Sequence, residues 1–143
     1  MSDLHKGDFT NHKSLAANHK SRVTTHKDLD VWKKAVDLSV DVYQFTKEFP
    51  REEMYAMSTQ MRRAAISIPS NIAEGAARRT DKDFVHFLYI ALGSASELDT
   101  QCEIGCRIGL LDEARREKLQ RRVEEVSKML YGLIRSVRGK QDG

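Results

Sequence analysis

The residues best suited to chemistry are polar side chains at helical spacing in the middle of the chain. They follow one another at intervals of four, three and four positions: Arg63, Ser67, Ser70 and Glu74. A helix would present all four on one side, with Asn71 next to them. A carboxylate held in such a cluster could act as a general base. A fully hydrogen-bonded network could instead fix the register of neighbouring helices.

An antiparallel neighbour helix would bring Glu97 opposite Arg63, and a buried pair would satisfy both charges. The catalytic interpretation makes Glu74 or Glu97 the base and leaves an enzyme with a site near Asn71 as one alternative. No nucleophile, base and orienting group occur together, however. We therefore interpret the set as a structural polar network that also repairs the hydrogen bonding lost at Pro69: Arg63, Ser67, Asn71, Glu74 and Glu97.

Metal and cofactor motifs are missing from the sequence. Paired Glu-x-x-His motifs build di-iron centres in helical bundles, but this chain has none, and Asp83-x-x-His86 occurs once. Cys102 and Cys106 lack the further ligands of a structural zinc, and no glycine-rich phosphate loop is present. We expect no metal, no cofactor, no catalytic residues and no small-molecule substrate.

Basic residues gather in two stretches of a chain whose formal net charge is only +3. The first surrounds a predicted turn and the second opens the last predicted helix: Arg78, Arg79 and Lys82, then Arg115, Arg116, Arg121 and Arg122. They form either an ordinary solvated face or a phosphate-binding surface, which repetition in an oligomer would strengthen. No aromatic side chains are interleaved with these cations, so base-specific readout is not indicated.

The sequence divides into an extension, a folded part and a short tail. Residues 1–27 are polar, carry His-Lys pairs every seven positions from His5 to His26, and resemble disordered segments in composition. Residues 28–138 are predicted to fold, and residues 139–143 form a tail. With no signal peptide, no apolar run of membrane-spanning length and two cysteines, we expect a cytoplasmic protein that does not contact a membrane.

Four helices are expected: from about residue 29 to 48, from 51–54 to about 77, from a cap at 80 to 107–109, and from a cap at 112 to about 137. The predicted N-caps are Asp28 or Asp30, then Thr80, then Asp112. Pro69 should kink the second helix, because it removes a hydrogen bond and crowds the Ala65 carbonyl. Short connections make neighbouring helices antiparallel. The predicted fold is all-α, an up-down-up-down four-helix bundle.

The helix expected over residues 29–48 has more apolar surface than one core needs. One apolar face contains Trp32, Val36, Val40 and Tyr43. A second set extends it sideways and predicts a homo-oligomer interface: Val31, Leu38, Val42, Phe45 and Phe49. Alternatively, the N-terminal extension covers this surface.

From about residue 29 to 138 the chain resembles bacterial four-helix-bundle proteins encoded by intervening sequences within 23S ribosomal RNA genes. The resemblance is carried by several motifs taken in order: Asp30-x-Trp32, Gln60-x-Arg62-Arg63-Ala64, Ile66-Ser67-Ile68-Pro69-x-Asn71-Ile72-Ala73-Glu74-Gly75, and Ile90-Ala91-x-Gly93-Ser94 followed by Glu97-Leu98.

This resemblance implies a homo-oligomer, a pentamer, of poorly known function and without established catalytic residues. Similar proteins are accessory factors of diversity-generating retroelements, where they contact a reverse transcriptase and nucleic acid through a basic ring. The expected partners are therefore a second copy of this chain and RNA or a nucleic-acid-handling protein. A protein-binding adaptor without nucleic-acid binding is the main alternative.

Overall fold

Helices account for nearly all of the described chain. The computed structural model describes residues 25–53 and 56–142. Its long helices are α2 (Asp30–Thr46), α3 (Met57–Ala76), α4 (Asp81–Arg107) and α5 (Glu113–Asp142), and two short 3-10 turns are η1 (His26–Asp28) and η2 (Arg51–Glu53). No strand occurs within these two ranges. The prediction of an all-α chain with four helices is confirmed.

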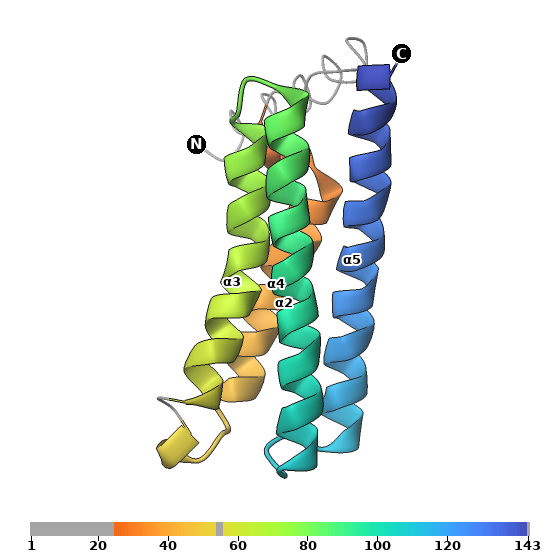
Figure 1. Cartoon of the computed structure of the whole chain (residues 1–143). Helices are drawn as coiled ribbons and strands as arrows, with labels where there is room; N and C mark the ends of the chain where they lie inside the picture. Colours follow the sequence, from red (N-terminus) through yellow and green to blue (C-terminus); the bar gives the residue numbers. More distant parts are fainter. Residues whose placement is uncertain (1–24, 54–55, 143) are drawn as a thin grey trace, which may run out of the picture.

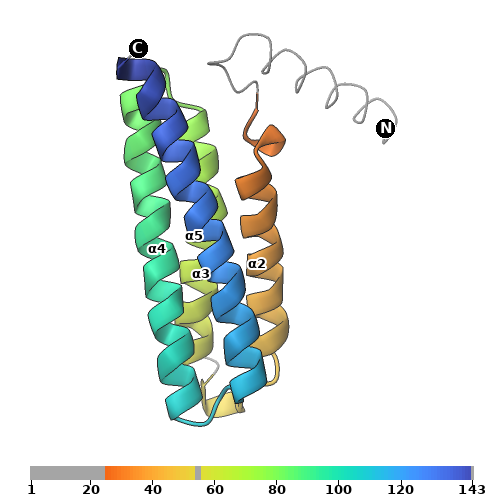
Figure 2. The same cartoon turned by 90° about the vertical axis from the view of Figure 1, so that its right-hand side faces the viewer.

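The four long helices run alternately up and down, so neighbours in sequence are neighbours in space (Figure 1). α5 completes the bundle by packing against α4 and, less extensively, against α2 (Figure 2). The α3–α4 turn and the C-terminal end of α5 therefore lie at one end of the bundle. The α4–α5 turn and η2 lie at the other end.

Side-chain caps set the start of two helices, as the sequence predicts. Thr80 Oγ1 accepts a hydrogen bond from the Asp83 backbone N–H at 3.1 Å, and Asp112 Oδ1 accepts one from the Arg115 N–H at 2.8 Å. The predicted Asp cap of α2 is wrong, because Leu29 occupies the N-cap position and makes no side-chain cap. The residues just before α2 are held instead by the backbone hydrogen bonds of η1.

Two helix boundaries differ from the prediction. α3 begins at Met57, after η2 has taken up the first residues expected to be helical. α5 continues through Gly139 to Asp142 rather than ending near Val137. Its last turns are supported from outside, because Arg138 Nη1 donates a hydrogen bond to Tyr89 Oη of α4 at 3.1 Å. This contact helps to offset the low helix propensity of the glycine.

Pro69 lies inside α3, which is one uninterrupted helix, and a bend at this position stays a prediction. The hydrogen bonding lost there is replaced from a neighbouring helix. Ser39 Oγ of α2 lies 3.0 Å from the carbonyl oxygen of Ala65, the acceptor four residues before the proline. The expectation that the polar network on α3 makes this repair is wrong, because a buried serine of α2 makes it.

The core runs along the axis of the bundle, and α2 places in it most of the residues predicted for an oligomer interface. Val31, Leu38, Val42 and Phe49 are buried within the single chain, and Phe45 is half-buried against the same cluster. The interface assignment is wrong for the four buried residues, since a side chain enclosed by its own bundle cannot meet a second subunit.

The exposed apolar side chains of α2 belong to the other set. Val40 is 52% exposed and Tyr43 is 39% exposed, and Trp32 and Val36 are half-buried. The set predicted to form the oligomer interface therefore lies mostly in the core of the bundle, and the other set contributes the exposed apolar side chains. Leu38 faces inward and Val40 faces outward.

Residues 1–24 lie outside the described residues, and with them three of the four His-Lys pairs and most of the predicted extension. The fourth pair is part of η1, where the His26 ring packs edge-on against Trp32 with centroids 5.0 Å apart. Across the described ranges, no helix combines the length and apolar character needed to cross a bilayer.

Candidate functional site

The predicted polar network forms in part, on the seam between α3 and α4. Ser67 Oγ and Ser94 Oγ are hydrogen-bonded at 2.8 Å. The Asn71 side-chain amide donates to the Ser67 carbonyl at 2.8 Å and to Ser67 Oγ at 2.9 Å. The Ser67–Ser94 hydrogen bond ties α3 to α4.

The charged members of the predicted network do not join it. Arg63 and Glu97 are exposed and form no ion pair with each other or with any other residue of the described ranges. Glu97 accepts a hydrogen bond from Gln101 Nε2 at 3.2 Å, and Glu74 pairs with Arg78 at 3.5 Å. The expected buried Arg63–Glu97 pair is wrong, because both side chains point to the bundle surface, where water solvates them.

Arg62, the residue before Arg63, packs against a neighbouring helix. Its Nε donates to Thr46 Oγ1 at 2.9 Å, and its guanidinium lies 4.4 Å from the centre of the Tyr43 ring. Thr46 is fully buried and its hydroxyl donates to the Val42 carbonyl at 2.7 Å. Arg62 thus links α3 to the end of α2. The sequence shows two adjacent arginines here, but it does not indicate which of them contacts α2 and which is exposed.

The two basic stretches lie at opposite ends of the bundle. Arg78, Arg79 and Lys82 belong to the α3–α4 turn and the first turn of α4, at the upper end in Figure 1. Arg115, Arg116, Arg121 and Arg122 belong to the first turns of α5, toward the lower end. The structure does not join them into one surface on a single chain.

Most of the arginines that open α5 are held in ion pairs within the chain. Arg115 contacts Glu48 of the α2–η2 connection at 3.2 Å. Arg116 contacts Glu113 and, at 3.5 Å, Glu103 of α4. Arg121 is exposed and makes no ion pair with a described residue. These pairs link α5 to its neighbours and reduce the positive charge available to an external anion.

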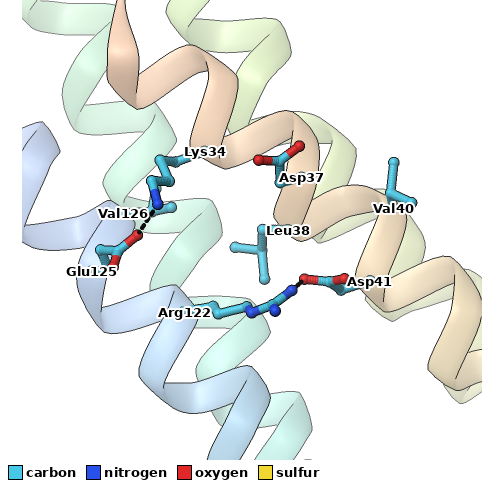
Figure 3. Close-up of a pocket in the computed structure, with 8 residues that line it drawn as sticks. All are labelled: Lys34, Asp37, Leu38, Val40, Asp41, Arg122, Glu125 and Val126. Atoms are coloured by element: carbon cyan, nitrogen blue, oxygen red, sulfur yellow. Dashed lines mark ion pairs between the residues drawn. The ribbon is translucent and has the colours of Figure 1, made fainter.

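Arg122 closes one side of a groove between α2 and α5 (Figure 3). It pairs with Asp41, and Lys34 pairs with Glu125 at 3.2 Å further along. The groove has a volume of about 430 Å³, and the apolar side chains that line it are Leu38, Val40 and Val126. Each cation faces an anion across the groove, and Asp37 adds a further negative charge to its lining, so the groove does not attract anions.

At the end formed by the α3–α4 turn, several cations have no ion pair with a described residue, although Asp81 and Asp83 lie in the same turn of α4 as Lys82. We call this part of the bundle the cationic end and define it by Arg78, Arg79, Lys82, Arg135 and Arg138. Arg78 pairs with Glu74 and lies over the Phe87 ring at 4.7 Å. Three other members are exposed and form no ion pair within the described ranges: Arg79, Lys82 and Arg135. Sequence reasoning missed the α5 contribution, because Arg135 and Arg138 are distant from the turn in sequence.

The two cysteines differ in burial. Cys102 is buried, and burial together with the nearby Asp99 charge raises its thiol pKa to about 12. Cys106 is half-exposed, with its Sγ 3.7 Å from Glu113 Oε2. In the described part of the chain, His, Cys, Asp and Glu side chains nowhere gather in a group of three that could hold a metal.

Comparison with known proteins agrees with this architecture. The crystal structure of a protein of unknown function from the S23 ribosomal protein family of Bacteroides thetaiotaomicron VPI-5482 is similar, with a TM-score of 0.66 and 27% sequence identity. The match covers 73% of this chain and 97% of that one. A comparison with curated proteins gives no match. Residues 27–132 match the family described as 23S rRNA-intervening sequence protein, and the chain belongs to that family.

Proposed function

We propose that this protein is a non-enzymatic homo-oligomer that binds RNA, alone or within a ribonucleoprotein, through the cationic end of its bundle. One observation carries the RNA-binding part. Arg79 and Lys82 at the α3–α4 turn and Arg135 of α5 come from two distant parts of the chain, lie toward one end of the bundle, and lack ion pairs with described residues. Cations that no carboxylate neutralises are the groups that release counterions when phosphates bind.

The oligomer part rests on the apolar surface that the bundle leaves exposed on α2 and α3. Arg62 of α3 packs on Tyr43 of α2, so Ile66, one turn further along α3, lies on the side of α2 that carries Tyr43 and, seven residues earlier, Val36. Val40 stands between this side and the groove toward α5. Ile66 is 41% exposed. We call this the α2–α3 face and define it by Val36, Val40, Tyr43 and Ile66.

A second copy of the chain is the proposed occupant of the α2–α3 face, in a ring of five as the family resemblance implies. A ring repeats the cationic end around one axis and so strengthens the field that a polyanion meets. Light scattering coupled to size exclusion tests this proposal. Wild type should elute as the oligomer, and Val40→Glu with Ile66→Glu should elute as a helical monomer. A wild-type monomer at micromolar concentration would overturn it.

Salt-dependent RNA binding tests the main proposal. Fluorescence anisotropy with a labelled 20-nucleotide RNA should give an affinity that falls as KCl rises. Its log–log slope should be about −2 for three phosphate contacts to a single strand. Absence of binding at 50 mM KCl would reject RNA binding.

A protein-binding adaptor is the second candidate, and exposed side chains on α4 favour it. Ile104 and Ile108 are both large, apolar and open to solvent near the lower end of the bundle. Affinity capture from nuclease-treated lysate separates the candidates. A partner retained after nuclease treatment and lost with Ile104→Glu would support the adaptor, whereas a partner released by nuclease would support RNA binding.

A further inference from the structure

Two exposed tyrosines lie on the side of the bundle where α4 and α5 approach the cationic end. Tyr89 of α4 is 45% exposed and Tyr131 of α5 is 51% exposed. Soluble proteins expose single apolar side chains routinely. Here two rings occur together with arginines, which is a more specific arrangement.

The hydrogen bond between Arg138 and Tyr89 fixes the register of the two helices at this point. Arg138 Nη1 lies 3.1 Å from Tyr89 Oη. Tyr131 precedes Arg138 by seven residues, which is two helical turns, and so shares its face of α5 about 10 Å along the axis. Gln120 of α5 lies beside Asp99 of α4, where its Nε2 donates to the Asp99 carbonyl. Because the two helices are antiparallel, Tyr131, eleven residues after Gln120, lies at about the level of Tyr89, ten residues before Asp99.

Cations flank the two rings on both helices. Lys82 precedes Tyr89 by seven residues on the same face of α4, and Arg135 follows Tyr131 by one turn on α5. Both are exposed and have no ion pair with a described residue. Asp81 and Asp83, the acids on either side of Lys82, each lie about 100° away from it around α4. The face thus presents Lys82, Tyr89, Tyr131, Arg135 and Arg138, and we call it the α4–α5 face.

The surface of α4 that follows Tyr89 is open. A Cβ atom built on Gly93, one turn after Tyr89, would meet no atom within 4 Å. Beyond it, α4 and α5 enclose a groove of about 510 Å³, whose polar lining includes Ser96, Ser127, Asp99 and Glu124. The two acids lie toward the far end of the groove, away from the cationic end. The phosphates of a ligand are therefore expected to lie next to the arginines, and its uncharged groups next to the tyrosines.

We infer that the α4–α5 face binds single-stranded nucleic acid by stacking bases on Tyr89 and Tyr131 while Lys82, Arg135 and Arg138 contact the phosphates. This inference rests on the proposed function and deepens it by naming the form of nucleic acid. Interleaved aromatic rings and cations are typical of single-strand binding, because every base offers a stacking surface. In a duplex, paired bases are stacked on each other and cannot stack on a side chain. The sequence expectation of no interleaved aromatic side chains concerned the basic residues at the turn and at the start of α5, and it did not include Arg135 and Arg138.

Anisotropy titrations of the full chain test the inference with three fluorescein-labelled RNA probes. They are a 12-nucleotide oligouridylate, an abasic strand of the same length and a 12-base-pair duplex. Wild type should bind the oligouridylate most tightly. Tyr89→Ala with Tyr131→Ala should weaken that binding by about tenfold or more and leave the abasic strand unchanged. Ile104→Ala, an exposed apolar residue at the other end of α4, is the matched control and should have no effect.

Conservative variants separate stacking from positioning. Tyr89→Phe with Tyr131→Phe removes the hydroxyl that accepts from Arg138 but keeps both rings, so it should retain wild-type affinity for oligouridylate. Equal loss in the Phe and Ala variants would overturn the inference, as would equal affinity for the strand and the duplex. Dissociation of the oligomer by the Ala variant, measured by light scattering, would also overturn it by making the tyrosines subunit contacts.

Charge reversal distinguishes failure of the inference from failure of the proposed function. If Lys82→Glu with Arg135→Glu abolishes binding but the Tyr→Ala pair does not change it, the polyanion surface stands and stacking is rejected. If no variant changes binding, or wild type binds none of the probes, both are rejected. Thermal melts of every variant should show intact folding, because all five side chains are at the surface.

Discussion

Ser39 of α2 supplies a hydrogen bond to the carbonyl of Ala65 that Pro69, in the same helix as Ala65, cannot supply. The serine hydroxyl lies 3.0 Å from the Ala65 oxygen and 3.0 Å from the Ala35 oxygen of its own helix. A buried carbonyl without a donor costs free energy of about 1–3 kcal/mol. The proline in α3 and the serine in α2 therefore belong to one structural feature.

Ser39→Ala should lower the free energy of unfolding by about 1–3 kcal/mol, because the Ala65 carbonyl then has no donor. The cost should fall to about 0.5 kcal/mol when Pro69 is also replaced by alanine, whose N–H restores the helical bond. Urea denaturation of the four proteins measures this coupling. Thr100→Ala is the control, since that exposed hydroxyl bonds only within its own helix. Equal costs in both backgrounds would show that Ser39 does not serve the proline.

The opposed roles of Leu38 and Val40 give a second prediction. Leu38 is 1% exposed, so Leu38→Ala should cost about 2–5 kcal/mol of unfolding free energy by leaving a cavity. Val40→Ala should change stability by less than about 0.5 kcal/mol but weaken self-association. Denaturation and light scattering on both variants check this. A stable Leu38→Ala monomer would restore the original interface assignment.

Alanine substitutions at two helical glycines test how closely α3 and α4 pack. A Cβ on Gly75 would lie 2.7 Å from Phe87 Cβ and 3.2 Å from the Phe84 carbonyl oxygen, whereas one on Gly93 would meet open space. Gly75→Ala should therefore destabilise the α3–α4 contact. Gly93→Ala should stabilise the protein by about 0.5–1 kcal/mol through helix propensity. Thermal melts that place the two variants in the reverse order would contradict this packing.

The two thiols should react at very different rates. With its pKa raised to about 12 by burial, Cys102 is almost entirely protonated at pH 8, and the thiolate is the reactive form. Titration with a thiol reagent at pH 8 should modify the half-exposed Cys106 first and Cys102 only after unfolding. A Cys106→Ser variant should thus be unreactive while folded. Rapid modification of that variant would show that the α4 core opens.

The sequence was informative where local rules decide the structure and ambiguous where packing decides. The Thr80 and Asp112 caps depend on residues three positions away, and both were predicted. Leu38 and Val40 have nearly the same polarity, and only the placement of α3 and α5 determines which is buried. Local spacing likewise could not identify Asp41 as the partner of Arg122, or Tyr89 as the partner of Arg138, because each partner comes from another helix.

The most direct test of the account compares RNA affinity after equal charge changes at the two ends of the bundle. One variant carries Arg79→Glu, Lys82→Glu and Arg135→Glu at the cationic end. The other carries Lys47→Glu, Lys118→Glu and Arg121→Glu toward the opposite end, and it changes the net charge by the same amount. Both should keep the helical circular dichroism of wild type. The first should bind the 20-nucleotide RNA at least about tenfold more weakly and the second within about threefold of wild type. Equal weakening by both variants, or by neither, would contradict an RNA surface at the cationic end.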